Sequence, residues 1–193
     1  VYMAEYFKWV LIASLLLLLL EIAKGRHKNI YCKSDFIILA GSILLGRGVM
    51  AALATGVVAA VYSFLLPGSL QGALAGLNYW LALLLVVLSD EFFFYWVHRN
   101  AHEGWGHKPY LNWLWKMHRT HHSADHLNVT VIYRLNLFWF FVIPTAWVMG
   151  LMLYLGLSEA ALTAILIKQF WNLITHSNFR WDDTLRSHPK IGP

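Results

Sequence analysis

Residues 89–102 read SDEFFFYWVHRNAH, and they end a long apolar stretch with two acidic residues, an aromatic run and two histidines. Residues i and i+4 share one face of an α-helix, so His98 and His102 should project together. A second motif, HRTHH at 118–122, adds His118, His121 and His122 at the helical spacings i, i+3 and i+4. Imidazole is the commonest metal ligand near neutral pH. The two motifs therefore predict a metal site built by two helical faces.

The composition around these motifs is that of a membrane protein. The chain is 59% hydrophobic and 13% charged, whereas a soluble domain averages about 25% charged residues. A membrane-spanning helix needs about 20 apolar residues. Five stretches approach this length: 6–23, 45–66, 77–97, 136–156 and 159–175. We predict an all-α integral membrane protein with four to five membrane helices and a cytoplasmic, histidine-rich helical cap.

The second stretch allows two interpretations. Residues 35–44 are also apolar, and we interpret them as an interfacial lead-in to the span at 45–66, because Gly46, Arg47 and Gly48 follow them. The alternative is one long tilted helix across 36–66.

The basic residues alternate between connections. They are frequent at 24–33, 98–134 and after 176, and the connections at 67–76 and 157–159 carry no basic residue. Positive charge favours the cytoplasmic side, so both motifs should face the cytoplasm in a multi-pass protein of the bacterial inner membrane or the endoplasmic reticulum. The net charge of +5 therefore reflects topology, and we expect no nucleic-acid partner. Cys32 is the one cysteine, which excludes a disulfide framework and a cysteine-rich zinc site.

A sixth histidine follows the last apolar stretch and returns to the same side. The expected ligands are His98, His102, His118, His121, His122 and His176. Asp90 lies near the His98 face, where it could orient a ligand imidazole, pair with Arg99 or Arg119, or form a purely structural ion pair. Tyr95 shares that face and could hydrogen-bond there. We expect no ligand role for the four other histidines, His27, His107, His126 and His188.

The motifs resemble those of the fatty acid hydroxylase superfamily, which includes sterol desaturases, sphingolipid and fatty acid hydroxylases and alkylglycerol monooxygenases. The resemblance covers roughly 77–181. It rests on three runs: Asp90–Phe94–Tyr95–Trp96–His98–Arg99–His102, then Trp115–His118–His121–His122–Ser123 with Asn128, and finally His176–Ser177–Asn178.

The resemblance implies a function and its cofactors. Two non-haem irons would activate dioxygen and hydroxylate or desaturate a lipid (sterol, fatty acyl, sphingolipid or alkylglycerol) that enters from the bilayer. The implied electron donor is one such as cytochrome b5 or ferredoxin with its reductase, and Asp90, Tyr95 and Asn178 would support the ligands. Zinc could replace iron during purification, since it ranks above iron(II) in affinity for such ligands.

We expect a single membrane domain over 1–193, with N-terminal helices at 1–76 and the histidine region at 77–193.

The chain departs from this family in one respect. The family has a third box, another His-x-x-His-His, which would follow Pro193. We therefore expect the sequence to be an internal fragment that is inactive on its own.

Two other classes of protein stay open on the residues alone. A membrane metal-binding or zinc-transport protein would place its ligands between helices at the middle of the bilayer. A haem protein would use single histidines on opposed helices. Both patterns differ from the one in this sequence, in which His-x-x-His-His lies beyond the end of an apolar helix.

Overall fold

The computed structural model describes residues 2–25, 28, 30–31 and 33–179, and the regular structure within these ranges is entirely helical. The elements, in chain order, are α1 (Tyr2–Lys24), α2 (Lys33–Gly41), η1 (Ser42–Met50), α3 (Ala51–Leu65), η2 (Gly68–Leu70), α4 (Tyr79–Glu103), η3 (Pro109–Leu111), α5 (Asn112–His118), η4 (Val129–Tyr133), α6 (Trp139–Val142), α7 (Pro144–Tyr154) and α8 (Ser158–Thr175). The predicted all-α class is confirmed for these residues.

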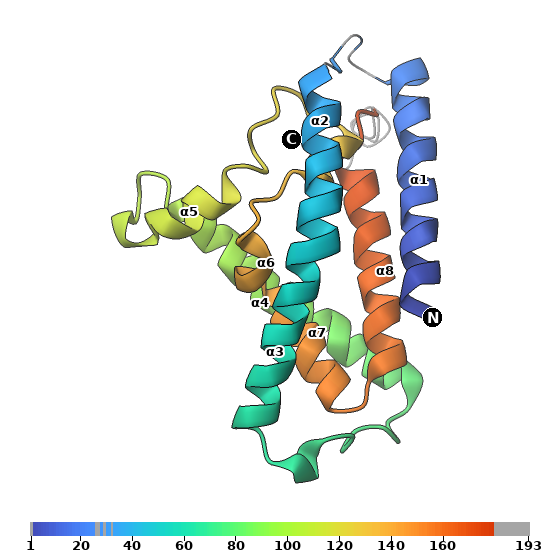
Figure 1. The fold of residues 1–193 in the computed structure, drawn as a ribbon, viewed down its shortest axis with the longest axis vertical. Coiled ribbons are helices and arrows are strands. Elements are labelled where there is room, and N and C mark those ends of the chain that lie inside the picture. The colour runs from blue at the N-terminus through green and yellow to red at the C-terminus, as the bar shows by residue number, and fades with distance from the viewer. Residues whose placement is uncertain (1, 26–27, 29, 32, 180–193) are drawn as a thin grey trace, which may run out of the picture.

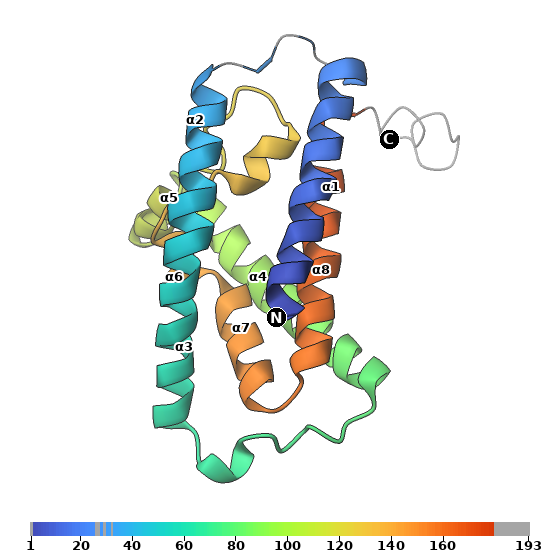
Figure 2. The same cartoon turned by 45° about the vertical axis from the view of Figure 1, so that its right-hand side comes forward.

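The long helices form a bundle that α4 crosses obliquely. Figures 1 and 2 show α1, the α2–α3 rod and α8 running roughly parallel, while α4 passes behind them toward α5. Helix α4 packs against α7 and α8, α3 packs against α7, and α1 packs against α8 and η4. The helices at 6–23, 77–97 and 159–175 are close to those expected from the apolar stretches.

The second apolar stretch forms one continuous helix, from Lys33 to Leu65. The predicted interfacial lead-in at 35–44 is therefore wrong, and the alternative of one long helix is confirmed. The rod passes through a π-helical segment, η1, without leaving helical backbone angles at Gly41 or Ala51. Gly46 in this segment lies against Phe140, since a Cβ there would be 3.1 Å from the ring. Gly46, one of the residues that suggested a boundary, thus allows close packing instead.

The stretch at 136–156 is not the single span that its hydropathy predicts. Ile143 is extended, with φ −60° and ψ 123°, and it separates the short α6 from α7. Pro144 is the cause, because proline has no N–H and disfavours helical geometry in the residue before it. Helix α7 has 11 residues, which gives a length of about 16 Å, too short to cross a bilayer core alone.

Helix α4 is the element that carries the first histidine motif. The side chain of Asn78 caps its start by accepting hydrogen bonds from the N–H groups of Trp80 and Leu81, at 3.0 and 3.3 Å. The helix then continues past the expected end at 97 to Glu103, as the motif spacing requires. Gly104 ends it in close contact with the backbone of Leu111. A side chain at Gly104 would push α5 away from α4.

Two helices among the described residues are long and apolar enough to cross a membrane, Lys33–Leu65 and Tyr79–Glu103. Different elements surround these two helices along the bundle. At one end the 66–78 connection bonds to the α7–α8 turn, through Gly72 N–H to the Tyr154 carbonyl at 2.9 Å. Helix α5 lies beside the α2–α3 rod, partway along its length (Figures 1 and 2), and the histidines meet where α4 ends and α5 follows.

Candidate metal centre

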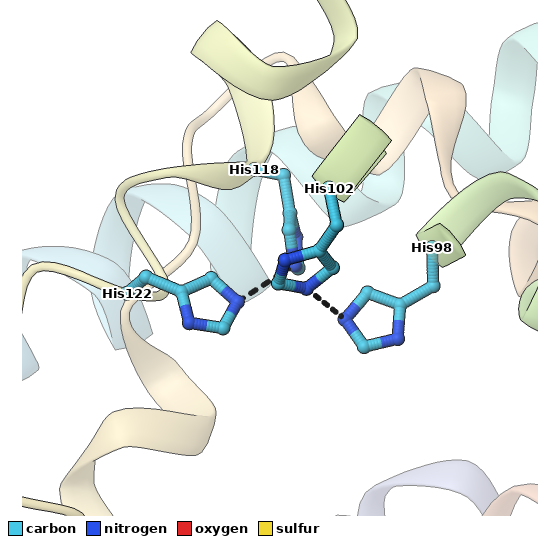
Figure 3. A group of neighbouring side chains, drawn as sticks. All are labelled: His98, His102, His118 and His122. Carbon is cyan, nitrogen blue, oxygen red and sulfur yellow. Dashed lines mark hydrogen bonds between the residues drawn. The ribbon is translucent and has the colours of Figure 1, made fainter. Parts of the chain in front are cut away.

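Four histidines from α4 and the α5 region face one another. Nε2 of His98 lies 3.1 Å from Nε2 of His102, and Nε2 of His118 lies 3.0 Å from Nε2 of His122. One ring nitrogen from each of the four residues lies within 4.8 Å of the other three. Figure 3 shows the four rings converging from two segments of chain. The spacing i, i+4 accounts for each pair, and the packing of α5 against α4 brings the pairs together.

The second motif is not helical throughout, contrary to the prediction. Helix α5 ends at His118, and the next residues form turns in which His121 N–H bonds to the His118 carbonyl at 2.9 Å and His122 N–H bonds to the Arg119 carbonyl at 3.0 Å. These turns bring His122 back to His118. His121 bonds in a different direction, so the three histidines do not share a single face.

His121 pairs instead with the sixth histidine. Its Nε2 lies 3.0 Å from Nε2 of His176, which follows α8. Nδ1 of His176 lies 3.0 Å from the carbonyl oxygen of Asn172. A carbonyl can only accept, so Nδ1 carries the proton and Nε2 of His176 keeps a free lone pair when the ring is neutral. The backbone of α8 thus orients this histidine as a ligand.

The six rings fit a metal ion by distance and by donor type. Zinc–imidazole bonds are about 2.1 Å long, so two nitrogens on one metal lie about 3.0 Å apart at a right angle and about 3.4 Å apart at a tetrahedral angle. The three observed Nε2 pairs, at 3.0 to 3.1 Å, match the first value. Hydrogen bonds between rings also give such distances within pairs. They do not account for four nitrogens from two pairs gathering within 4.8 Å.

Burial keeps these rings neutral. It lowers the pKa of His118 to about 2 and the pKa of His121 to about 3, and the positive charge that neighbouring histidines would carry adds to the effect. Burial also lowers the pKa of His122 and of His176. Metal binding requires the neutral imidazole, so this group is in its binding form at pH 7.

Aromatic rings form the walls of the histidine group. The Trp139 ring lies 5.0 Å from the His118 ring and is almost fully buried. The Trp115 ring lies 5.9 Å from the His122 ring and from the His102 ring. Phe94 is the residue of the aromatic run whose ring approaches a site histidine, at 5.4 Å from His98. These rings give His118 an apolar setting, whereas His122 is exposed.

The three predicted supporting residues bond elsewhere. The carboxylate of Asp90 accepts from Lys168 Nζ at 2.7 Å, and the partner is therefore neither a histidine nor Arg99 or Arg119. The hydroxyl of Tyr95 is exposed and accepts from Arg99 at 3.2 Å. The backbone N–H of Asn178 donates to the carboxylate of Glu21 in α1. That these three residues support the ligands therefore stays a prediction. Asp90 is linked to the site only indirectly, because its partner Lys168 has its Nζ 3.9 Å from the Phe94 ring, which in turn lies near His98.

The other histidines stay apart from the group. His107 and His126 are exposed, and neither belongs to the four-histidine group. His27 and His188 lie outside the described residues.

Glu21 and Lys168 are the main residues that the sequence reasoning missed. A signal was present, because an ionisable residue within an apolar helix is costly and marks a specific partner.

Comparison with known families assigns the chain. The fatty acid hydroxylase family model matches residues 83–191, which is more than half of the 193 residues. The chain belongs to the fatty acid hydroxylase family. The predicted resemblance is thereby confirmed, and all six histidines lie within the matched region. Comparison with curated proteins and with solved structures gave no match. Membership in a membrane-associated family, together with the two apolar helices, indicates a membrane protein.

Proposed function

We propose that this protein is a membrane-bound, non-haem di-iron oxygenase that hydroxylates or desaturates a lipid. The observation that carries the proposal is the convergence of six imidazoles, four in one group and two in a second pair, where α4 ends and α5 follows and beside the end of α8. An all-imidazole set suits iron, zinc and copper, and the family membership favours iron. The bound metals would activate dioxygen toward an unactivated C–H bond.

The residues of the chain have separate tasks in this proposal. His98, His102, His118 and His122 would hold one metal, and His121 and His176 would contribute to the second. The α8 backbone fixes the tautomer of His176 through Asn172, which is the usual way in which an outer partner orients a ligand histidine.

The surface of the bundle supports a multi-pass arrangement in the bilayer. Leu15, Leu16 and Leu19 on α1 and Phe64 on α3 are large apolar side chains that are more than half exposed. Exposed apolar side chains of this kind suit contact with lipid. We propose that the histidine end faces the cytoplasm, because the connections at that end are basic, and that the lipid substrate enters from the bilayer.

An electron donor is needed, because oxygenation of one C–H bond by dioxygen consumes two electrons and two protons and releases water. We propose an acidic donor such as cytochrome b5, or a ferredoxin with its reductase. Lys116 and Arg119 are exposed next to His118 and would attract an acidic surface.

The competing transporter function is less well supported. Ligands for a transported ion would lie between helices at the middle of the bilayer. The four-histidine group instead lies where α4 ends and α5 follows.

The test combines metal analysis with lipid analysis. Full-length protein purified after growth with iron should contain bound iron, and cells that express it under oxygen should contain an oxidised lipid that control cells lack. His118→Ala should abolish the product and lower the iron content. His107→Ala is the matched control, because His107 is exposed and outside the group, and it should leave both unchanged. Iron content and product that survive His118→Ala would refute the assignment.

A further inference from the structure

A buried carboxylate in the first helix connects η4 with the residues that follow α8, near the second histidine pair. Glu21 of α1 has no exposed surface. Its carboxylate accepts hydrogen bonds from the N–H of Val129, at 3.1 Å to each oxygen, and from the N–H of Asn178. The hydroxyl of Tyr31 donates to it at 2.5 Å. A buried carboxylate is costly unless it is hydrogen-bonded, so these donors and Glu21 fix one another in place.

One amide lies in η4, which the His121 ring approaches, and the other lies two residues after His176. Val129 begins η4, and the backbone of Val131 in the same element is near enough to the His121 ring to affect its pKa, although Nδ1 of His121 makes no hydrogen bond among the described residues. Asn178 is separated from His176 by Ser177 alone. The carboxylate therefore joins the backbone near one ring to the backbone near the other, and the two Nε2 atoms meet at 3.0 Å.

Gly25 shows how closely α1 approaches the residues that follow α8. A Cβ at Gly25 would lie 2.6 Å from Nδ2 of Asn178 and 2.5 Å from the Glu21 carbonyl oxygen, closer than real Cβ atoms come. The end of α1 and Asn178 are thus in direct contact. Any larger residue at position 25 must move Asn178 or the end of the helix.

The four-histidine group has no such dependence. His98 and His102 lie on α4, His118 lies on α5, and the turns after α5 hold His122 through the Arg119 carbonyl. Among the described residues, the Glu21 carboxylate accepts hydrogen bonds from Tyr31, from Val129 in η4 and from Asn178 after α8. The carboxylate therefore acts on one half of the site.

We propose that Glu21 is a positioning residue that holds His121 and His176 at the separation needed to share a metal ion. The inference rests on the proposed function, since it concerns the second of the two metals. It also makes α1, which lies outside the matched region 83–191, a part of the metal centre. Removal of the Glu21 carboxylate should weaken binding of this metal and leave the metal of the four-histidine group in place.

The test compares metal stoichiometry in variants of the full-length protein. Iron(II) or zinc is titrated into metal-free protein, and bound metal is measured by elemental analysis. Glu21→Gln keeps the shape of the side chain but removes the negative charge that strengthens the hydrogen bonds from both backbone amides. It should weaken one metal equivalent about ten- to a hundred-fold, the effect typical of a lost outer partner, and leave the other at wild-type affinity. Gly25→Ala should have the same selective effect without touching the carboxylate.

Two controls separate positioning from a general loss of stability. Glu159→Gln makes the same chemical change at an exposed residue in the first turn of α8, and it should bind metal as wild type does. Tyr31→Phe removes one donor to Glu21 but leaves both backbone amides bonded, so both metals should be retained.

A second measurement does not use metal content. Hydrogen exchange at the Val129 and Asn178 amides should be slow in metal-free wild type and fast in Glu21→Gln. Coupling is reciprocal, so metal loading of the wild type should slow exchange at both amides further. This wild-type comparison decides the question if the variants fail to fold.

The possible failures are distinguishable. Wild-type protein that binds no metal would overturn the proposed function. Wild-type protein with two metals, together with Glu21→Gln that keeps both at full affinity or loses both equally, would overturn the positioning role alone. Amide exchange at Val129 and Asn178 that does not respond to metal would do the same.

Discussion

Replacement of Lys168 by methionine should destabilise the protein by about 3 kcal/mol, the lower end of the range for breaking a buried ion pair. Lys168 Nζ lies 2.7 Å from Asp90 Oδ2, and the side chains are 10% and 3% exposed. The other oxygen, Oδ1 of Asp90, is buried without a hydrogen-bond partner among the described residues. Loss of the lysine thus leaves a carboxylate buried between α4 and α8. We take the lower end because one of the two side chains, that of Lys168, keeps 10% of its surface exposed.

Replacement of both partners should restore most of the stability. A cavity of about 270 Å³ lined by Asp90, Lys168 and Trp171 gives room for a leucine at position 90. Asp90→Leu with Lys168→Met should therefore lie within about 1 kcal/mol of wild type, because well-packed apolar residues often replace a buried pair without loss.

The assay is equilibrium unfolding in mixed detergent micelles, followed by the helical circular dichroism signal, for wild type, both single variants and the double variant. Arg99→Met is the control, because its ion pair with Glu103 lies at the surface, and its unfolding curve should overlap that of wild type. If the two single losses add up in the double variant to within about 0.5 kcal/mol, the pair is not coupled and the argument is wrong.

Three further predictions concern topology, pH and packing. Cysteines at Ser69 and Lys116, in a variant without the native cysteine, should be labelled from opposite sides of the membrane; labelling of both from one side would refute the proposed topology. Metal-free protein should lose thermal stability as the pH falls below about 6.5. Histidine in the unfolded chain is protonated there, whereas His118, whose pKa is about 2, stays neutral in the fold. A melting temperature that is constant from pH 7.5 to pH 5 would contradict this. Leu173→Ala should cost about 2 to 5 kcal/mol, measured by the same unfolding assay, since Leu173 has no exposed surface and packs against η4; a loss below that range would show that the neighbouring residues close the cavity.

The apolar stretches predicted the long helices because each runs its full length without a strong helix breaker. The stretch at 136–156 failed for the opposite reason. Pro144 lies within it, and the extended conformation that proline favours in the preceding residue divides the helix at Ile143. Hydropathy reports the affinity of a segment for lipid, whereas the backbone of a single residue decides whether the segment is one helix.

The residues around the site were harder to predict. Lys168 is a charge within the apolar stretch 159–175, but its partner Asp90 lies far away in the sequence, and nothing local connects α8 to α4. The same holds for Glu21 and the amide of Asn178. Such pairs depend on which helices pack together, and a single sequence shows the cost of the buried charge without showing its partner.

The histidine pairs differ in the same way, because two of them depend on local spacing and the third depends on which helices pack together. His98 with His102, and His118 with His122, are set by local spacing, which survives even where a turn replaces the expected helix, because turns with i to i+3 bonds keep such residues close. His121 and His176 meet only through the packing of α1, α8 and η4. Partial unfolding that separates these elements would therefore break the second pair while the four-histidine group persists. If the proposed centre holds two metals, they should differ in lability for this reason, and the more labile one should be held by His121 and His176, whose meeting depends on the packing of the fold.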